Sequence, residues 1–247
     1  MHALVVTAVA AEADSVAAGL KRLTAPAPHP DGPVTPTRTL PGGYAIGRHD
    51  VPGLAVDVLV AGVGPAAAAA ATATALAVAA PGTYRLVVSA GIGGGFPPAA
   101  PVGSLVVADA LVAADLGAQT PEGFLTVEQL GFGRAVHLPP ADLAARAAEA
   151  TGALLAPVLT VSTVTGSASR AAELAAAHPL AGAEAMEGFG VAEAAAAHGL
   201  PVLELRAVSN AVGPRDRSAW RIGEALEALA EGFHRLVPVL RGGDLHG

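Results

Sequence analysis

Glu12, Glu187 and Asn210 are the residues of this 247-residue chain that are best placed to do chemistry. Each lies at the end of a short apolar run that is typical of a β-strand. A carboxylate can take a proton from water or stabilise a positive charge, and an amide can donate and accept hydrogen bonds. Because ligands bind at the carboxyl ends of strands in open α/β sheets, we expect these side chains to converge on one site. Taken singly, each has a structural alternative as a helix N-terminal acid or an Asn cap.

Two glycine-rich segments also follow apolar runs. Residues 61–67 match the G-x-G-x-x-A pattern of a dinucleotide-binding turn, but no acid that could hold the ribose occurs between Asp57 and Asp109. Residues 89–96, SAGIGGGF, predict a turn whose backbone N–H groups face a ligand. The segment lacks the Lys-Ser/Thr pair of a phosphate-binding loop, so we predict no nucleotide cofactor.

The composition disfavours several other classes of protein and site. The chain has no Cys, which excludes disulfides and thiolate chemistry, and its eight His show no chelating spacing, so we predict no metal. The formal net charge of -7 disfavours a nucleic-acid partner, and the absence of G-x-S-x-G disfavours a serine hydrolase. The Ala-rich run at 65–80 is shorter than the roughly 20 residues that cross a bilayer. We therefore expect a cytoplasmic protein with no membrane partner.

The elements that must position the three residues follow from the alternation of Val/Leu/Ile-rich and Ala-rich runs. Continuously apolar strands are typical of βαβ units with both sheet faces covered, which predicts an α/β fold around a mostly parallel sheet. Strands are predicted over residues 3–9, 54–61, 86–90, 104–108, 155–161, 183–186 and 202–208, and helices over 12–20, 65–80, 141–151, 169–177, 189–198 and 218–240. Residues 26–41 predict a loop before an edge strand near 44–48, and 115–137 an irregular segment that covers a ligand or decorates the surface. No linker divides the chain, so residues 1–247 are expected to form one domain.

Six segments, in order, carry a resemblance to a known family: VVTAVAAEA, VLVAGVGPAAAA, SAGIGGGF, VGSLVVAD, AEAMEGFGVA and RAVSNAVGPRDRSAW. The chain resembles the nucleoside phosphorylase and nucleosidase superfamily over nearly its whole length, and within it most closely the futalosine hydrolases. The resemblance implies a central mixed sheet, partly closed into a barrel and surrounded by helices. It also implies cleavage of the N-glycosidic bond of a purine nucleoside by a homo-oligomer.

The resemblance further implies roles for the residues named first. In the related methylthioadenosine/S-adenosylhomocysteine nucleosidases, the acid that matches Glu12 activates water, with Asp14 as the alternative here. The pair that matches Met186 and Glu187 packs on the ribose and holds its hydroxyls, and the residue that matches Asn210 binds the departing base. The chemistry supports this division independently, because cleavage builds an oxocarbenium-like ribose that one carboxylate stabilises while another activates water.

Departures from the family pattern indicate the base. Asn210 replaces the acid of the adenine-cleaving relatives, and its amide can donate to a purine O6 and accept from a protonated N7, so hypoxanthine is expected. The stacking aromatic residue of those relatives has no counterpart in residues 160–170, where Thr165 and Gly166 are expected to line the base. Further substrate contacts are expected from the second glycine-rich segment, at Gly91, Ile92 and Gly93.

The nucleophile and the far end of the substrate complete the hypothesis. Phosphorylases of the superfamily carry an Arg where this chain has Ser89, and a buried phosphate dianion without a partner is costly, so water is favoured. Futalosine carries a carboxylated aromatic group on the 5′ side of its ribose, which Arg215 or Arg217 is expected to bind. Pairing of these residues with Asp216 is the structural alternative. Further candidates for that contact are Arg48 and His49.

The expected function is hydrolysis of futalosine to hypoxanthine and dehypoxanthinyl futalosine, a step towards menaquinone. Two alternatives stay open. The first is a nucleosidase for methylthioadenosine, S-adenosylhomocysteine or aminodeoxyfutalosine, against which Asn210 argues. The second is a non-catalytic protein that binds purine nucleosides, against which Glu12 argues.

Overall fold

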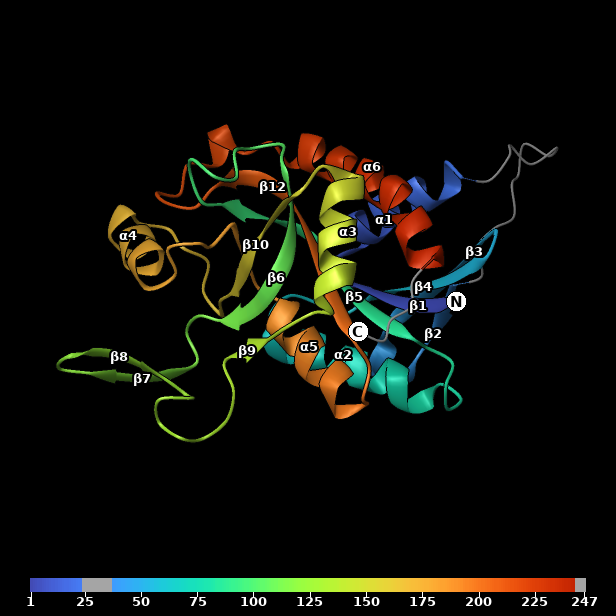
Figure 1. The fold of residues 1–247 in the computed structure, drawn as a ribbon, viewed down its shortest axis with the longest axis horizontal. Helices are drawn as coiled ribbons and strands as arrows, with labels where there is room; N and C mark the ends of the chain where they lie inside the picture. Colours follow the sequence, from blue (N-terminus) through green and yellow to red (C-terminus); the bar gives the residue numbers. More distant parts are fainter. Residues whose placement is uncertain (24–36, 243–247) are drawn as a thin grey trace.

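The computed structural model describes residues 1–23 and 37–242, with a mixed ten-stranded sheet at the centre and helices on both of its faces (Figure 1). The strands of this sheet are β1 (His2–Thr7), β2 (Thr37–Thr39), β3 (Ala45–Val51), β4 (Leu54–Val60), β5 (Leu86–Gly95), β6 (Leu105–Ala113), β9 (Val136–His137), β10 (Leu154–Thr160), β11 (Ala183–Ala185) and β12 (Val202–Ala211). The helices are α1 (Ala10–Lys21), α2 (Pro65–Val78), α3 (Ala141–Thr151), α4 (Ala168–Ala177), α5 (Gly188–Ala197) and α6 (Ile222–Arg241).

Part of the sheet closes on itself. Five strands form a ring, in the order β5, β12, β6, β10 and β11, because β11 pairs with β5 as well as with β10. The sheet continues outward from β5 through β1, β4, β3 and β2. This arrangement confirms the predicted mixed sheet that is partly closed into a barrel. The expectation of a mostly parallel sheet holds only in part. The pairs β1–β4, β1–β5, β5–β12, β6–β10 and β10–β11 are parallel, but β12–β6, β11–β5, β3–β4, β2–β3 and β6–β9 are antiparallel.

The predicted glycine-rich turn at 89–96 is wrong, because β5 continues as a strand to Gly95. Its glycines serve close packing instead of a change of direction. A Cβ atom on Gly93 would lie 2.7 Å from the backbone oxygen of Glu184, and one on Gly95 would collide with the carbonyl of Ala100. Glycine therefore lets β11 approach β5 and close the ring.

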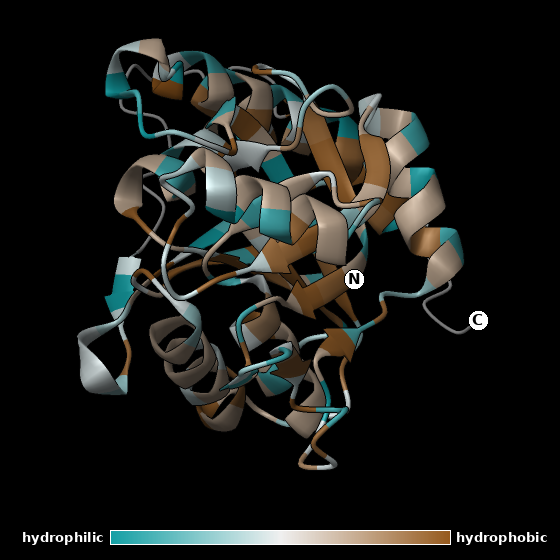
Figure 2. Ribbon diagram, turned by 90° about the vertical axis from the view of Figure 1, so that its left-hand side faces the viewer, coloured by the Kyte–Doolittle hydropathy of each residue, from teal (hydrophilic) through white to brown (hydrophobic). Residues whose placement is uncertain are grey.

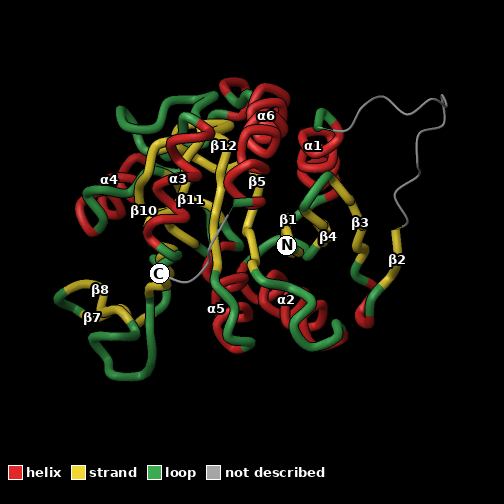
Figure 3. Tube along the Cα trace, turned by 45° about the vertical axis from the view of Figure 1, so that its right-hand side comes forward, coloured by secondary structure: helices red, strands yellow, loops and turns green. Residues whose placement is uncertain are grey.

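Two apolar cores cover the two faces of the sheet. α1, α3 and α6 pack on one face through residues such as Val16, Leu143 and Phe233, and α2 and α5 pack on the other (Figure 3). Leu4 and Val5 of β1 belong to different cores, which explains why the strands are apolar at consecutive positions. In Figure 2 the brown, hydrophobic strands lie in the interior, and teal, hydrophilic residues occur on the helices and loops around them.

Both segments that were predicted as irregular contain strands. Within 115–137, β7 (Gly117–Thr120) and β8 (Gly123–Thr126) form a hairpin that projects from the sheet, and β9 pairs with β6 (Figure 1). Most of 26–41 lies outside the described residues, but Thr37–Thr39 form β2, so β3 is not the edge strand. Neither β2 nor the hairpin is an apolar run, so the hydrophobic pattern missed both.

Candidate active site

The centre of the site is a buried arginine that the sequence analysis did not single out. Arg206 of β12 has no exposed surface. Its Nε donates to Glu204 at 2.8 Å, its Nη1 to Glu187 at 3.2 Å and its Nη2 to the Ser89 hydroxyl at 3.0 Å. Burial by itself lowers the pKa of Arg206, but the surrounding carboxylates outweigh it and raise that pKa. The available signal was a pair of charges, two residues apart, inside the otherwise apolar run VLELRAV.

Glu12 lies in the first turn of α1 and is 4% exposed. Its Oε2 accepts from the backbone N–H groups of Ala8 (2.9 Å) and Val9 (3.2 Å), so the side chain caps its own helix. Its Oε1 accepts from the N–H of Ile92 in β5, at 2.9 Å. Burial raises the pKa of Glu12, and Arg206 and the N–H of Ile92 oppose that rise. The result is a carboxylate that is held rigidly and is more basic than an ordinary Glu.

Glu187 precedes α5 and is 7% exposed. Its Oε1 accepts from the N–H of Gly64, at 3.2 Å, just before α2 begins. Gly64 has a φ of 97°, a conformation that favours glycine. The Oε2 of Glu187 accepts from Arg206 and, at 3.3 Å, from the N–H of Met186. Contacts from the residue before α2, from the residue after β11 and from β12 therefore fix this carboxylate.

Glu12 and Arg206 approach each other over Gly91. A Cβ atom on Gly91 would lie 2.5 Å from Oε1 of Glu12 and 2.8 Å from Nη1 of Arg206. Any side chain here would displace one of these groups, so glycine is required. A carboxylate, a guanidinium and bare backbone thus meet at one point of β5.

Asn210 lies four residues after Arg206 in β12 and is partly exposed. Its Oδ1 accepts from the Ser209 hydroxyl at 2.8 Å, and its Nδ2 donates to the carbonyl of Ala211 at 3.0 Å. The Ser209 hydroxyl also lies 3.2 Å from the carbonyl of Gly93, and Gly94 is the register partner of Asn210 in β5. Asn210 therefore lies at the carboxyl end of the same pair of strands as Gly91.

Thr165 is held by another buried acid, Glu184 of β11, which is 5% exposed. The N–H of Thr165 donates to one oxygen of Glu184 at 2.8 Å, and its hydroxyl donates to the other. The next residue, Gly166, accepts at its carbonyl from the N–H of Arg215, at 3.2 Å. The loop after β10 and the loop after β12 are therefore joined.

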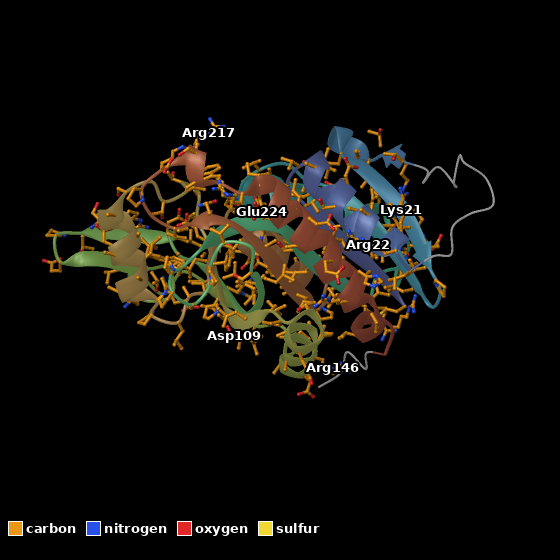
Figure 4. All side chains as sticks on the ribbon, turned by 90° about the horizontal axis from the view of Figure 1, so that it is seen from above. Lys21, Arg22, Asp109, Arg146, Arg217 and Glu224 are labelled. Atoms are coloured by element: carbon orange, nitrogen blue, oxygen red, sulfur yellow. The ribbon has the colours of Figure 1, made fainter. Side chains whose placement is uncertain are left out.

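The loop after β12 presents two cations on one aromatic ring. The guanidinium carbons of Arg215 and Arg217 lie 5.0 and 5.9 Å from the ring centroid of Trp220. Within the described part of the chain neither forms an ion pair, and Asp216 instead caps a short turn by accepting from Ser218 at 3.0 Å. The helix predicted from residue 218 consequently begins only at α6, after this turn. In Figure 4 the side chain of Arg217 points away from the ribbon at the margin of the molecule.

The other candidates for the far end of the substrate lie elsewhere. Arg48 and His49 belong to β3, where Arg48 lies 2.9 Å from Asp50 and 3.8 Å from Asp57. That position is near His2 at the amino end of β1, whereas Glu12 follows the carboxyl end. No described contact joins either residue to the Arg206 cluster.

The structure thus gathers the expected residues into two adjoining groups. The first contains Glu12, Met186, Glu187, Gly91, Ile92, Gly93 and Asn210, together with Arg206. The second contains Thr165, Gly166, Arg215 and Arg217. Residues 1–23 and 37–242 contain no cluster of three His, Asp or Glu residues that could hold a metal, and no helix in these ranges is long and apolar enough to span a membrane.

A family model described as the phosphorylase superfamily matches residues 4–239, and the chain belongs to this family. Within the family, the chain is similar to curated futalosine hydrolases. It is 60% identical over 248 residues to the futalosine hydrolase of Streptomyces coelicolor, which covers 100% of this chain and 99% of the relative. It is 47% identical over 243 residues to the futalosine hydrolase of Acidothermus cellulolyticus, covering 94% of this chain and 89% of the relative.

Solved structures share the fold at lower identity. A futalosine hydrolase mutant of Helicobacter pylori gives a TM-score of 0.78 at 17% identity and covers 96% of this chain and 99% of its own. A methylthioadenosine/S-adenosylhomocysteine nucleosidase of Colwellia psychrerythraea, in complex with adenine, gives 0.75 at 24% identity and covers 98% and 95%. The fold is therefore that of the nucleoside phosphorylase-like enzymes.

Proposed function

We propose that this protein hydrolyses the N-glycosidic bond of futalosine, releasing hypoxanthine and leaving dehypoxanthinyl futalosine. The observation that carries the proposal is the buried carboxylate of Glu12, which meets Arg206 over Gly91. The names of the full-length relatives supply the substrate. A protein that only binds nucleosides has no need to bury a carboxylate of raised basicity at this point.

Glu12 is the general base in this mechanism. When the C1′–N9 bond breaks, its electron pair goes to the purine, which leaves as neutral hypoxanthine because its N7 has taken a proton from solvent, and the ribose becomes oxocarbenium-like. A water oxygen then bonds to C1′, and Glu12 takes the proton that this water loses. The three backbone N–H groups on Glu12 fix its orientation, so little reorganisation is needed at the moment of transfer.

Glu187 and Asn210 bind the two halves of the nucleoside. Glu187 accepts from the ribose hydroxyls while Arg206 and the N–H of Gly64 hold its carboxylate, and Met186 packs on the sugar. Asn210 exchanges its local bonds to Ser209 and Ala211 for the O6 and N7 of hypoxanthine. Gly91, Ile92 and Gly93 line the ribose side, and Thr165 and Gly166 line the base.

Water is the nucleophile because the described residues around Glu12 and Glu187 offer phosphate no free cation. Ser89 is fully buried and accepts from Arg206, and every donor nitrogen of Arg206 already faces an oxygen of a protein side chain. A phosphate dianion would have to lie against Glu12 and Glu187, and the repulsion between like charges opposes that.

The far end of the substrate and the setting of the enzyme complete the proposal. Arg215 and Arg217, which stack on Trp220 and form no described ion pair, bind the carboxylate on the 5′ side.

The product enters the route to menaquinone in the cytoplasm. Residues 1–247 form one domain. The chain assembles as a homo-oligomer, as the resemblance to the nucleosidase superfamily implies.

The test is a panel of nucleosides incubated with purified protein, with and without phosphate, and resolved by chromatography. We expect hypoxanthine from futalosine at a rate that phosphate does not change. Preferential release of adenine from methylthioadenosine would replace the proposal with an adenine nucleosidase, and cleavage only with phosphate would replace it with a phosphorylase. Binding without release of any base would indicate a binding protein.

A further inference from the structure

Glu204 is the most deeply buried acid near the site, and the proposed function gives it no part. It lies two residues before Arg206 on the same face of β12, and its exposed fraction is 0%. Its Oε1 accepts from Nε of Arg206, at 2.8 Å, whereas its buried Oε2 has no hydrogen-bond partner among the described groups. A Cβ atom on Gly188 would collide with both oxygens, so the start of α5 is packed directly against this carboxyl group.

The charges around Arg206 do not balance if every acid is ionised. Glu12, Glu187 and Glu204 surround a single guanidinium, which would leave two uncompensated negative charges in the interior. Burying charge without a partner costs several kcal/mol per ion, and proteins avoid that cost by retaining a proton. At least one of the three carboxyl groups therefore carries a proton.

The hydrogen bonds indicate which group carries it. Both oxygens of Glu12 and both oxygens of Glu187 accept from N–H donors, and a proton on any of them would face a donor. Oε2 of Glu204 is the exception, because no such donor points at it. Burial raises the pKa of Glu204 most strongly and the charge of Glu187 adds to that rise, while the charge of Arg206 and its hydrogen bond oppose it.

We propose that Glu204 is a protonated positioning residue, which holds Arg206 by Nε so that Nη1 faces Glu187 and the space over Gly91. The proposal rests on the proposed function, because it assigns Glu204 to the same site. A neutral carboxylic acid fixes the guanidinium without neutralising it. The positive charge of Arg206 therefore remains available to Glu12 and Glu187, which keeps both acids ionised for their roles.

The test compares two substitutions of nearly equal size. Glu204→Gln keeps a neutral side chain with an acceptor for Nε of Arg206 and a donor at the position of Oε2, so we expect kcat to stay within about 3-fold of the wild-type value. Glu204→Leu removes the acceptor, and we expect kcat to fall roughly 10- to 100-fold with little change in KM. Glu227→Gln, on the exposed side of α6, is the matched control and should change neither constant.

A second measurement is independent of turnover and of the substrate. The infrared spectrum of the wild-type protein at neutral pH should contain the C=O stretching band of a protonated carboxyl group, and Glu204→Gln should remove it while Glu227→Gln leaves it. The proposal is overturned if the band is unchanged in Glu204→Gln, if Glu204→Gln loses as much kcat as Glu204→Leu, or if Glu204→Leu is as active as the wild type. Should the wild type fail to cleave futalosine, the function is wrong, and the infrared comparison still decides the proton.

Discussion

Replacing Glu12 by Gln removes the base while keeping the shape of the side chain. General-base catalysis contributes about 10²- to 10⁴-fold, so kcat should fall by roughly 100-fold or more, which corresponds to at least about 2.7 kcal/mol of transition-state stabilisation. KM should change little, because Glu12 faces the attacking water and Glu187 holds the ribose. The residual rate reports the stabilisation that the other groups provide.

The fold should tolerate this substitution, for reasons that can be worked out from the contacts. Burial raises the pKa of Glu12 in the folded state, so its ionised form at neutral pH reduces the free energy of unfolding, and a neutral amide removes that cost. The substitution also costs stability, because the NH₂ group of Gln must face the backbone N–H group of Ile92 or those of Ala8 and Val9, and two donors cannot form a hydrogen bond. A lost hydrogen bond costs about 1 kcal/mol, so the two effects oppose each other and Tm should shift by a few degrees at most.

The assay is steady-state release of hypoxanthine from futalosine across pH, with Asp14→Asn as the control for the neighbouring acid. Because the ionised form of Glu12 is the active one, the wild-type kcat should fall as pH drops through a pKa above the ordinary 4.5, and this acid limb should be absent in Glu12→Gln. If Glu12→Gln retains the wild-type kcat and acid limb, Glu12 is not the base. A loss in Asp14→Asn alone would transfer the role to that residue.

Three further substitutions test the rest of the site. Glu187→Gln should slow cleavage of inosine more than that of 2′-deoxyinosine, because the deoxy sugar lacks one partner; equal losses would count against the hydroxyl contact. Asn210→Asp should shift kcat/KM from hypoxanthine towards adenine nucleosides, by a few kcal/mol at most, since an ionised acid repels O6; an unchanged preference would place base selection elsewhere. Arg215→Ala and Arg217→Ala should weaken futalosine by roughly 1.5 to 3 kcal/mol in kcat/KM and barely affect inosine, which lacks the carboxylate; equal effects on both substrates would leave the stack on Trp220 a structural role only.

The local pattern of apolar residues was enough to predict most of the helices and strands. α3 spans Ala141–Thr151 as predicted, because its apolar residues recur on one face of a helix and Gly152 ends it with a φ of 69°. The buried strands were recognisable as continuously apolar runs, although β5 and β12 extend beyond the predicted ends. The sequence also placed Glu12, Glu187 and Asn210 at strand ends, since each directly follows an apolar run.

The tertiary structure decided what depends on pairing between distant segments. The ring of strands closes because β11 pairs with β5, and the glycines that permit that approach are the ones that predicted a turn. A glycine-rich segment is compatible with both outcomes, and only the partner strand selects between them.

The linear pattern of residues likewise could not predict which charged groups meet in the site. Arg206 occurs in a run that looks like a core strand, and its role depends on acids from α1, from the start of α5 and from its own strand. A buried guanidinium is stable only when such partners surround it, because desolvation is otherwise too costly. The sequence by itself therefore determined which residues could do the chemistry and on which elements they lie, while the packing of those elements decided which acids share one cation.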